Sequence, residues 1–225
     1  SGEGADEIFG GYSRYLMLAQ DRDLTDEMIL YSNAFVPQND ARAATGNTLD
    51  LELSARRALL GDSSDQHRKL AEYDIETYLP PLLLRQDKMG MRSSLENRVP
   101  FLDADLVCAA LALPQEEKYS STESKILLKK IASDFLPPEI VYRKKVGFGQ
   151  PIEAWLRNES GLGAYLVFFT HPNPPRDFFD YAAIQEMIMR HREKKGNYTA
   201  ILWALINLEL WTRIFIDGKD PHAIF

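Results

Sequence analysis

The sequence predicts a mainly α protein, built as an orthogonal helical bundle. Apolar residues recur at helical spacing in several segments, and residues that begin or end helices stand at the borders of those segments. Nowhere do apolar and polar residues alternate for long enough to predict a β-strand. The 225 residues, 45% of them hydrophobic and 26% charged, are enough for a soluble globular fold with a sizeable core.

Each helix is predicted from its apolar spacing and its borders. Thr25 is the expected N-cap of the second helix, because its hydroxyl can accept a hydrogen bond from the first turn. Pro80 and Pro81 divide one long helical segment into two, because proline is tolerated in a first turn but not in a helix interior. Asp103 can cap the helix that Pro114 ends. The predicted helices cover about 12–20, 26–35, 51–60, 66–78, 79–94, 104–113, 122–132, 181–191 and 199–215.

The polarity of further segments predicts which of their residues are exposed and which are buried. Residues 37–49 are polar and are expected to form an exposed loop. Lys125, Lys129 and Lys130 lie off the apolar face of their predicted helix and are expected to be solvated. Cys108 stands in an apolar run and is expected to lie in the core rather than to act as a nucleophile.

The last predicted helix has a wide apolar face, which includes Leu208, Trp211 and Phe215 and is expected to be buried.

The composition excludes several classes of function. A net charge of −7 and a pI near 5.2 argue against nucleic-acid binding, which requires a basic surface. With Cys108 as the single cysteine no intrachain disulfide can form, which is compatible with the cytoplasmic location that we expect. No apolar run approaches the roughly 20 residues that cross a bilayer, so no membrane association is expected. The histidines have no spacing typical of a zinc site.

The opening stretch, residues 1–15, combines glycines with carboxylates. Its glycines allow a ligand to approach the main chain closely, and Glu3, Asp6 and Glu7 stand between them. Clustered carboxylates are costly unless a cation, a helix N-terminus or solvent compensates them. Because Mg²⁺ is bound through one or two carboxylates together with substrate phosphates, the stretch could form a metal and phosphate site. The alternative is an ordinary helix start, where acidic residues oppose the helix dipole.

Three motifs follow one another along the chain. They are Ser1-Gly2-Glu3-Gly4-Ala5-Asp6-Glu7-Ile8-Phe9-Gly10-Gly11-Tyr12, Leu95-Glu96-Asn97-Arg98-Val99-Pro100-Phe101-Leu102-Asp103 and Arg143-Lys144-Lys145-Val146-Gly147-Phe148-Gly149-Gln150-Pro151. In this order, and with the helical end around Trp203 and Trp211, the chain resembles the asparagine synthetase family over nearly its whole length. These proteins carry an ATP-dependent, amide-forming domain.

The resemblance implies that residues 1–225 are the C-terminal portion of such a synthetase domain. The domain has an α/β fold of the ATP-pyrophosphatase-like (adenine nucleotide alpha hydrolase-like) type, and this chain would be its helical part, with most of the parallel sheet missing. The upstream glutaminase domain and the Ser-Gly-Gly-x-Asp-Ser pyrophosphate loop of the family are absent from the sequence. We therefore expect a fragment that is catalytically inactive alone and binds ATP weakly.

The resemblance also implies catalytic and nucleotide-binding residues. Glu3 matches an acidic residue that acts as a base on the incoming amine or orients substrate, and Lys145 matches a lysine of the intermediate-forming step. Ser1 and Gly2, with Glu3, match the stretch that lines the nucleotide and substrate pocket. Independently of the resemblance, Lys145 precedes glycines around Phe148, which allow a loop to fold over a ligand.

Three further residues belong to the predicted site. Asp6 matches a position associated with Mg²⁺ beside the ATP phosphates. Glu96 and Arg98 stand two residues apart and have two interpretations. They form a structural ion pair, or one of them orients the substrate by supporting Glu3 or by holding an α-carboxylate.

The implied activity is that of a glutamine-hydrolysing asparagine synthetase. Mg-ATP adenylates a carboxylate, that of the aspartate side chain, and ammonia from glutamine then forms the amide. The implied partners are these small molecules and the missing N-terminal domains of the same polypeptide, with a homo-oligomer possible. Two alternatives remain open: a synthetase or amidotransferase of the same family that acts on a β-lactam precursor, a peptide or a sugar acid, and a non-catalytic helical interaction module.

Overall fold

The computed structural model describes residues 1–20, 24–46, 50–144 and 149–224. All regular secondary structure in these ranges is helical, and none of their residues forms a β-strand. The prediction of a mainly α fold is confirmed, whereas the relation to an α/β synthetase domain stays a prediction. The chain divides into two compact units, Ser1–Ala34 with Glu52–Lys145 and Phe35–Leu51 with Val146–Phe225.

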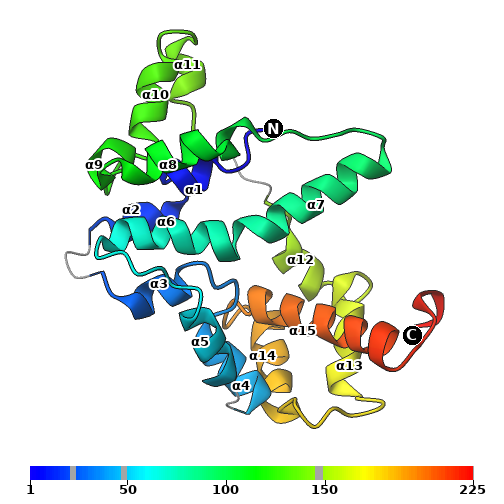
Figure 1. Ribbon diagram of the computed structural model, residues 1–225. Helices are drawn as coiled ribbons and strands as arrows, with labels where there is room; N and C mark the ends of the chain where they lie inside the picture. Colours follow the sequence, from blue (N-terminus) through cyan, green and yellow to red (C-terminus); the bar gives the residue numbers. More distant parts are fainter. Residues whose placement is uncertain (21–23, 47–49, 145–148, 225) are drawn as a thin grey trace. The chain divides into compact units, whose positions relative to one another are not determined.

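The first unit is organised around a short helix at its N-terminus, α1, which packs against α6, α8 and α10 (Figure 1). Its apolar core has two parts among the described residues: a group of aromatic and aliphatic side chains around Tyr15 and Tyr73, and a smaller group around Ile8 and Phe9. The helices are α1 (Ala5–Phe9), α2 (Ser13–Leu18), α3 (Asp26–Ser32), α5 (Asp50–Arg57), α6 (Gln66–Thr77), α7 (Leu79–Arg92), η1 (Pro100–Leu102), α8 (Ala104–Ala112), α9 (Gln115–Lys118), α10 (Ile126–Ala132) and α11 (Pro138–Val141).

Several predicted helix borders of this unit are confirmed. Thr25 caps α3 by accepting a hydrogen bond from the backbone N–H of Met28 at 3.3 Å. Asp103 caps α8 by accepting hydrogen bonds from the second and third backbone N–H groups of that helix. Between α6 and α7 the chain turns at Tyr78, and the two prolines lie in the first turn of α7.

Three predictions for this unit are wrong. Cys108 is exposed; α8 is apolar on most of its surface and only its Ala110 is fully buried, so hydrophobicity alone did not indicate the inward side. The helix expected from residue 122 begins at Ile126, since Lys125 has a φ of 55° and ends the preceding turn in a left-handed conformation. Lys125 and Lys129 are partly buried and paired rather than solvated, Lys129 with Glu123 at 3.3 Å and Lys125 as described below.

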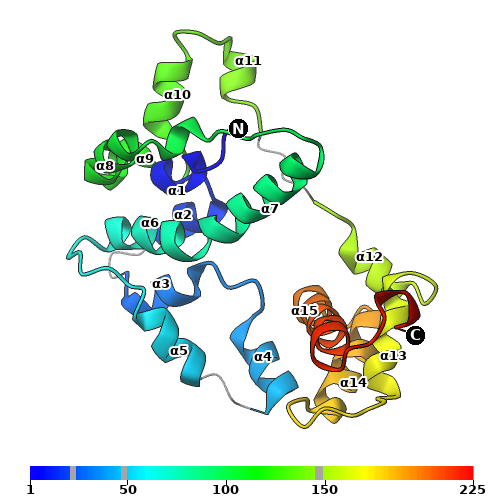
Figure 2. The ribbon, with the colours of Figure 1, turned by 45° about the vertical axis from the view of Figure 1, so that its right-hand side comes forward.

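The second unit contains the C-terminal helices and one earlier helix. Its elements are α4 (Gln38–Thr45), α12 (Ile152–Arg157), η2 (Leu162–Leu166), α13 (Val167–Thr170), α14 (Tyr181–Arg192), α15 (Thr199–Trp211), a π-helical turn η3 (Thr212–Ile216) and η4 (Pro221–Ala223) (Figure 2). The expected loop over 37–49 is therefore wrong for most of its length. Pro37 precedes a polar helix rather than a loop, and this helix buries Ala44, whose carbonyl oxygen accepts from the backbone N–H of Asp180 at 2.8 Å.

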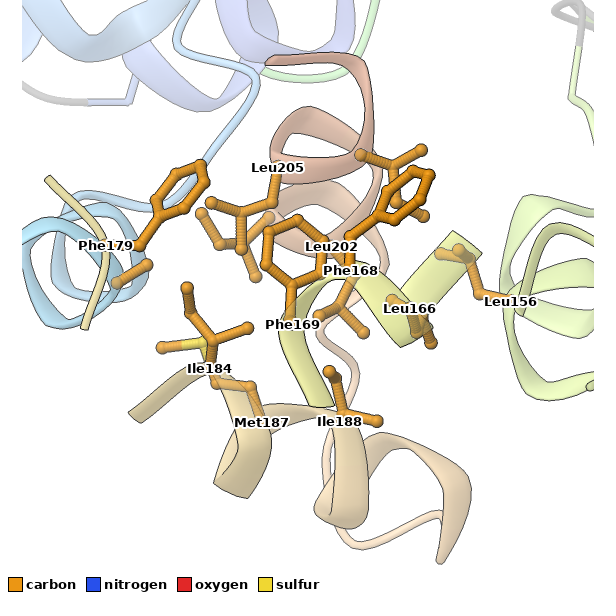
Figure 3. Packing of buried hydrophobic residues seen from close by; sticks show 13 residues of the cluster. Leu156, Leu166, Phe168, Phe169, Phe179, Ile184, Met187, Ile188, Leu202 and Leu205 are labelled. Carbon is orange, nitrogen blue, oxygen red and sulfur yellow. The ribbon is translucent and has the colours of Figure 1, made fainter. Parts of the chain in front are cut away.

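A single apolar cluster forms the core of the second unit. Figure 3 shows Phe169 among side chains of α14, such as Ile184, and of α15, such as Leu202 and Leu205. All four side chains are almost completely removed from solvent. Burial of this continuous cluster supplies the main driving force for folding of the unit.

The last helix is only partly as predicted. Its apolar face toward the cluster is buried, but Leu208, Trp211 and Phe215 are exposed by 40%, 52% and 68%. By length and composition the stretch Thr199–Ile216 could also cross a membrane, contrary to the expectation that no apolar run is long enough. Core helices of soluble proteins have the same composition, and the buried side chains of α15, such as Leu202 and Leu205, pack in the apolar cluster.

Candidate active site

The first motif folds as the short helix α1 between two glycines in the left-handed region. Gly4 has a φ of 91° and Gly10 a φ of 64°, which other residues adopt only with strain. Both glycines are also closely packed: a Cβ atom on Gly4 would overlap the side chain of Leu102, and one on Gly10 would overlap the ring of Tyr119. Glycine is thus required at both ends of α1 by backbone conformation and by space.

Asp6 projects from α1 toward a lysine. The Nζ atom of Lys125 lies 3.1 Å from Oδ1 of Asp6, and each side chain is about three-quarters buried. A Cβ atom on Gly11 would overlap both groups, so this glycine provides the room for the pair. The sequence analysis missed Lys125, because its left-handed backbone, and not helical spacing, directs its side chain to Asp6.

Glu7 points the opposite way, into the first unit. Its side chain is 1% exposed, and Oε1 accepts a hydrogen bond from the hydroxyl of Tyr12 at 2.6 Å. Within the described part of the chain, Oε2 is buried and has no hydrogen-bond partner. Burial raises the pKa of the Glu7 carboxyl above its ordinary value, although the Tyr12 hydrogen bond acts in the opposite direction. The three carboxylates of the motif are therefore not one cluster, because Glu7 is turned away from the surface.

A buried polar network continues from Tyr12. The Arg14 guanidinium lies 4.2 Å above the Tyr12 ring and donates to Oδ2 of Asp74 at 2.8 Å. The same carboxylate accepts from the Tyr15 hydroxyl at 2.7 Å and from the Asn33 amide at 3.1 Å. Asp74 is fully buried, and these donors compensate its charge.

The structure brings the first two motifs together. The backbone nitrogen of Ser1 donates to the carbonyl oxygen of Arg98 at 2.6 Å, and the backbone N–H of Glu3 donates to Oγ of Ser1 at 3.2 Å. Glu96 and Arg98 form an ion pair of 2.5 Å, with both side chains largely exposed. The structural pairing of these two residues is thus observed, and their role toward a substrate stays a prediction.

The described residues include only part of the third motif. Lys145, which was predicted to be catalytic, lies outside the described residues, so its position relative to Glu3 and Asp6 is untested. Arg143 and Lys144, which precede it, are exposed.

Asp6 and Glu3 are the carboxylates of the first motif that could bind a hard cation such as Mg²⁺. Among the residues that the structure describes, no group of three His, Cys, Asp or Glu side chains could hold a metal ion. Asp6 offers one partly exposed carboxylate, Glu3 is half-buried, and Glu7 is inaccessible. This set suits Mg²⁺ bound mainly by the oxygens of a nucleotide and by one or two protein carboxylates, and not a cage made by the protein alone.

A separate cleft of about 460 Å³ opens in the first unit. It is lined by side chains of both charges, which include Asp26, Arg57 and Lys69. Lys69 and Asp26 already pair there at 2.9 Å. None of the predicted site residues lines this cleft.

Comparison with known proteins identifies the family. The sequence model of the asparagine synthase family matches residues 1–213. Glutamine-hydrolysing asparagine synthetase 1 of Bacillus subtilis is 29% identical to the present sequence, and the match covers 97% of this chain. A putative glutamine-hydrolysing asparagine synthetase of Mycobacterium tuberculosis is 27% identical, and the match covers 96% of this chain. Asparagine synthetase 3 of B. subtilis is 31% identical over 64% of the chain. No solved structure matches.

The chain spans 40% of the length of the first of these relatives and 39% of the second. The family match nevertheless covers all three motifs, including the two that meet in the first unit. The chain belongs to the asparagine synthase family.

Proposed function

We propose that this chain is the C-terminal part of a glutamine-hydrolysing asparagine synthetase, which adenylates the side chain of aspartate and converts it to an amide. The family match over 1–213 is the observation that carries the proposal, and the close packing of Gly4 of the first motif against Leu102 of the second supports it. In the reaction a carboxylate oxygen of the substrate attacks the α-phosphorus of ATP and pyrophosphate leaves. Ammonia then attacks the acyl carbon, loses a proton, and AMP leaves.

The residues of this chain would have the following roles in the reaction. Ser1 and Gly2 line the nucleotide pocket, and Glu3 accepts the proton of the attacking ammonia or orients the substrate. Lys145 neutralises charge as the adenylate forms. Asp6 would bind Mg²⁺, which when present supplies positive charge next to the phosphates.

Glu96 or Arg98 would orient the carboxylate substrate, since their ion pair lies on the segment that touches Ser1. The Asp6–Lys125 pair adds a second cation to this surface.

Variants of the complete synthetase polypeptide that contains this chain test the proposal. Lys145→Ala is expected to abolish ATP–pyrophosphate exchange, because it removes a group of the first step. Glu3→Ala is expected to abolish amide formation while some exchange remains, if the carboxylate serves the second step. Glu117→Ala, which changes an exposed acid of the same unit, is the matched control and should leave both rates unchanged.

Retained activity in both Lys145→Ala and Glu3→Ala would contradict the catalytic assignment and favour a non-catalytic helical module. Adenylation of a β-lactam precursor, a peptide or a sugar acid in preference to aspartate would keep the chemistry and change the substrate. Robust exchange by the 225-residue chain alone would contradict the proposal that most phosphate contacts come from another part of the polypeptide. We also propose that the enzyme is cytoplasmic, in keeping with its single exposed cysteine.

A further inference from the structure

The link between Glu7 and Tyr12 spans the turn that ends α1. Gly10 and Gly11 form this turn, and the 2.6 Å hydrogen bond from the Tyr12 hydroxyl to Glu7 Oε1 joins the residues on its two sides. The helix on one side, α1, has only five residues. A helix of this length is not stable by itself, so its orientation depends on contacts with its surroundings.

Burial of a carboxyl at this contact has a desolvation cost in free energy. Glu7 is almost fully buried near Asp6 and Asp74, and one of its oxygens has no partner among the described residues. An apolar side chain of similar size would avoid that desolvation cost. What an apolar side chain cannot do is accept the hydrogen bond of Tyr12. The contact with Tyr12 therefore accounts for a hydrogen-bond acceptor at this position.

Tyr12 is itself held firmly. The Arg14 guanidinium lies over its ring, and the ring of Tyr78 meets it edge-on at 5.4 Å between centroids. Arg14 is in turn fixed by the buried Asp74. The Tyr12 hydroxyl that binds Glu7 thus belongs to a rigid part of the unit, so its hydrogen bond can hold the Gly10–Gly11 turn in place.

The position of the turn controls Asp6. A Cβ atom on Gly11 would overlap Oδ1 of Asp6 and Cε of Lys125, and the backbone N–H of Gly11 donates to the carbonyl oxygen of Asp6 at 2.8 Å. A small movement of Gly11 would change the distance between the Asp6 carboxylate and the Lys125 ammonium.

We propose that Glu7 and Tyr12 are positioning residues, whose hydrogen bond closes the Gly10–Gly11 turn and so holds the Asp6 carboxylate in the place where it binds a divalent cation. This proposal rests on the proposed function of Asp6 as a metal ligand. It separates the acidic residues of the motif by role: Asp6 binds, whereas Glu7 fixes the geometry from the inside and never touches the cation.

Binding of Mn²⁺, added with ATP to the complete synthetase polypeptide labelled with ¹⁵N-glycine, tests the proposal. Paramagnetic broadening of the Gly10 and Gly11 amide signals reports occupancy near Asp6 even when binding is weak. Tyr12→Phe and Glu7→Leu are each expected to weaken binding about 10-fold or more, as is typical when a residue that orients a metal ligand is lost. The double variant should lose no more than either single one, because both remove the same hydrogen bond.

Conservative variants separate positioning from general stability. Glu7→Gln keeps an oxygen that accepts from Tyr12 and should bind Mn²⁺ as the unchanged chain does. Tyr73→Phe is the matched control, because it removes a buried tyrosine hydroxyl of the same unit that hydrogen-bonds to the Leu30 carbonyl oxygen and not to α1. It should leave Mn²⁺ binding unchanged. If Glu7→Leu fails to fold, Tyr12→Phe and Glu7→Gln still decide the question.

Two results would overturn the proposal in distinguishable ways. If Asp6→Asn abolishes binding but folded Tyr12→Phe binds as the unchanged chain does, Asp6 is a metal ligand and the positioning role is wrong. If Asp6→Asn binds Mn²⁺ as well as the unchanged chain, the metal assignment fails and the positioning role fails with it.

Discussion

The two units of the chain bury charged side chains in different ways. In the second unit Glu209 accepts hydrogen bonds from two arginines, and Arg176 also forms a two-pronged contact with Asp217. In the first unit the buried Glu7 leaves one oxygen without a partner among the described residues, and the neighbouring Arg14 leaves its Nε in the same state.

The apolar cores also differ. Among the described residues, the second unit has one apolar cluster, whereas the buried apolar residues of the first unit fall into two separate groups. The contrast in polar groups concerns the two glutamates, because the second unit also leaves Nε2 of His191 and Nε2 of Gln38 without a described partner, and Asp74 of the first unit is fully paired. Glu7, unlike Glu209, is incompletely paired beside a glycine-rich motif, as is typical where stability is given up for a functional geometry.

The largest expected effect comes from the core of the second unit. Phe169→Ala should lower the free energy of unfolding by about 3–5 kcal/mol, because it leaves a cavity in a cluster that cannot collapse fully. Urea denaturation of the chain measures it. Phe178→Ala, which removes a neighbouring ring that is 42% exposed, is the control and should cost about 1 kcal/mol. Equal losses in the two variants would show that the cluster is not the main support of the unit.

The same substitution at two buried glutamates tests the difference in charge burial directly. Glu209→Gln leaves Arg176 and Arg213 without their shared counter-charge, at an expected cost of about 3–5 kcal/mol in unfolding free energy. Glu7→Gln should change that free energy little, because it removes no ion pair and retains the acceptor for Tyr12. A large loss in Glu7→Gln would mean that the first unit is as tightly paired as the second.

Alanine substitutions at Gly10 and Gly46 test how closely the first motif is packed. Gly10 and Gly46 have nearly the same φ, 64° and 65°, but a Cβ atom would meet the Tyr119 ring only at Gly10. Gly46→Ala should cost about 1 kcal/mol for the left-handed backbone. Gly10→Ala should cost about 2–4 kcal/mol, since displacement of the ring adds to the same backbone term. Equal unfolding free energies for the two variants would contradict close packing at Gly10.

Acid should weaken the second unit through His191. This side chain is fully buried, and its Nδ1 accepts from the backbone N–H of Tyr198 at 3.2 Å. Burial first, and then the nearby Arg157, lower the pKa of His191 in the folded chain, while Glu153 acts in the opposite direction. The unfolded chain therefore takes up the proton first, so stability is lost as the pH falls through the ordinary histidine pKa toward the lowered one.

Urea midpoints at pH 7.5 and pH 5 check this expectation. The decrease on acidification should be smaller in His191→Gln than in the unchanged chain. His171→Gln, which changes an exposed histidine of the same unit, serves as the control and should retain the full decrease. An identical decrease in all three proteins would exclude His191 as its source.

Features encoded by neighbouring residues could be predicted from the sequence. The cap at Thr25 and the prolines at the start of α7 act within one helical turn, and both predictions are confirmed. The polar helix α4 was missed because its single buried residue, Ala44, gives no apolar periodicity.

For the site, sequence reasoning identified the motifs, and the contact of Ser1 with Arg98 joins two of them. It could not tell Asp6 from Glu7, because the inward side of a five-residue helix is decided by residues distant in the sequence, such as Lys125 and the helices α6 and α8.

Gly11 differs from the other glycines of its motif in a way that affects which substitutions the protein tolerates. It does not have a positive φ, so a side chain would not strain its backbone, yet the space beside it is filled by the Asp6–Lys125 pair. In a saturation mutagenesis library this position should tolerate fewer residues than Gly46 and Gly218, which have open space around them and should accept asparagine. Intolerance at Gly11 would thus report the integrity of one ion pair and not a demand of the main chain.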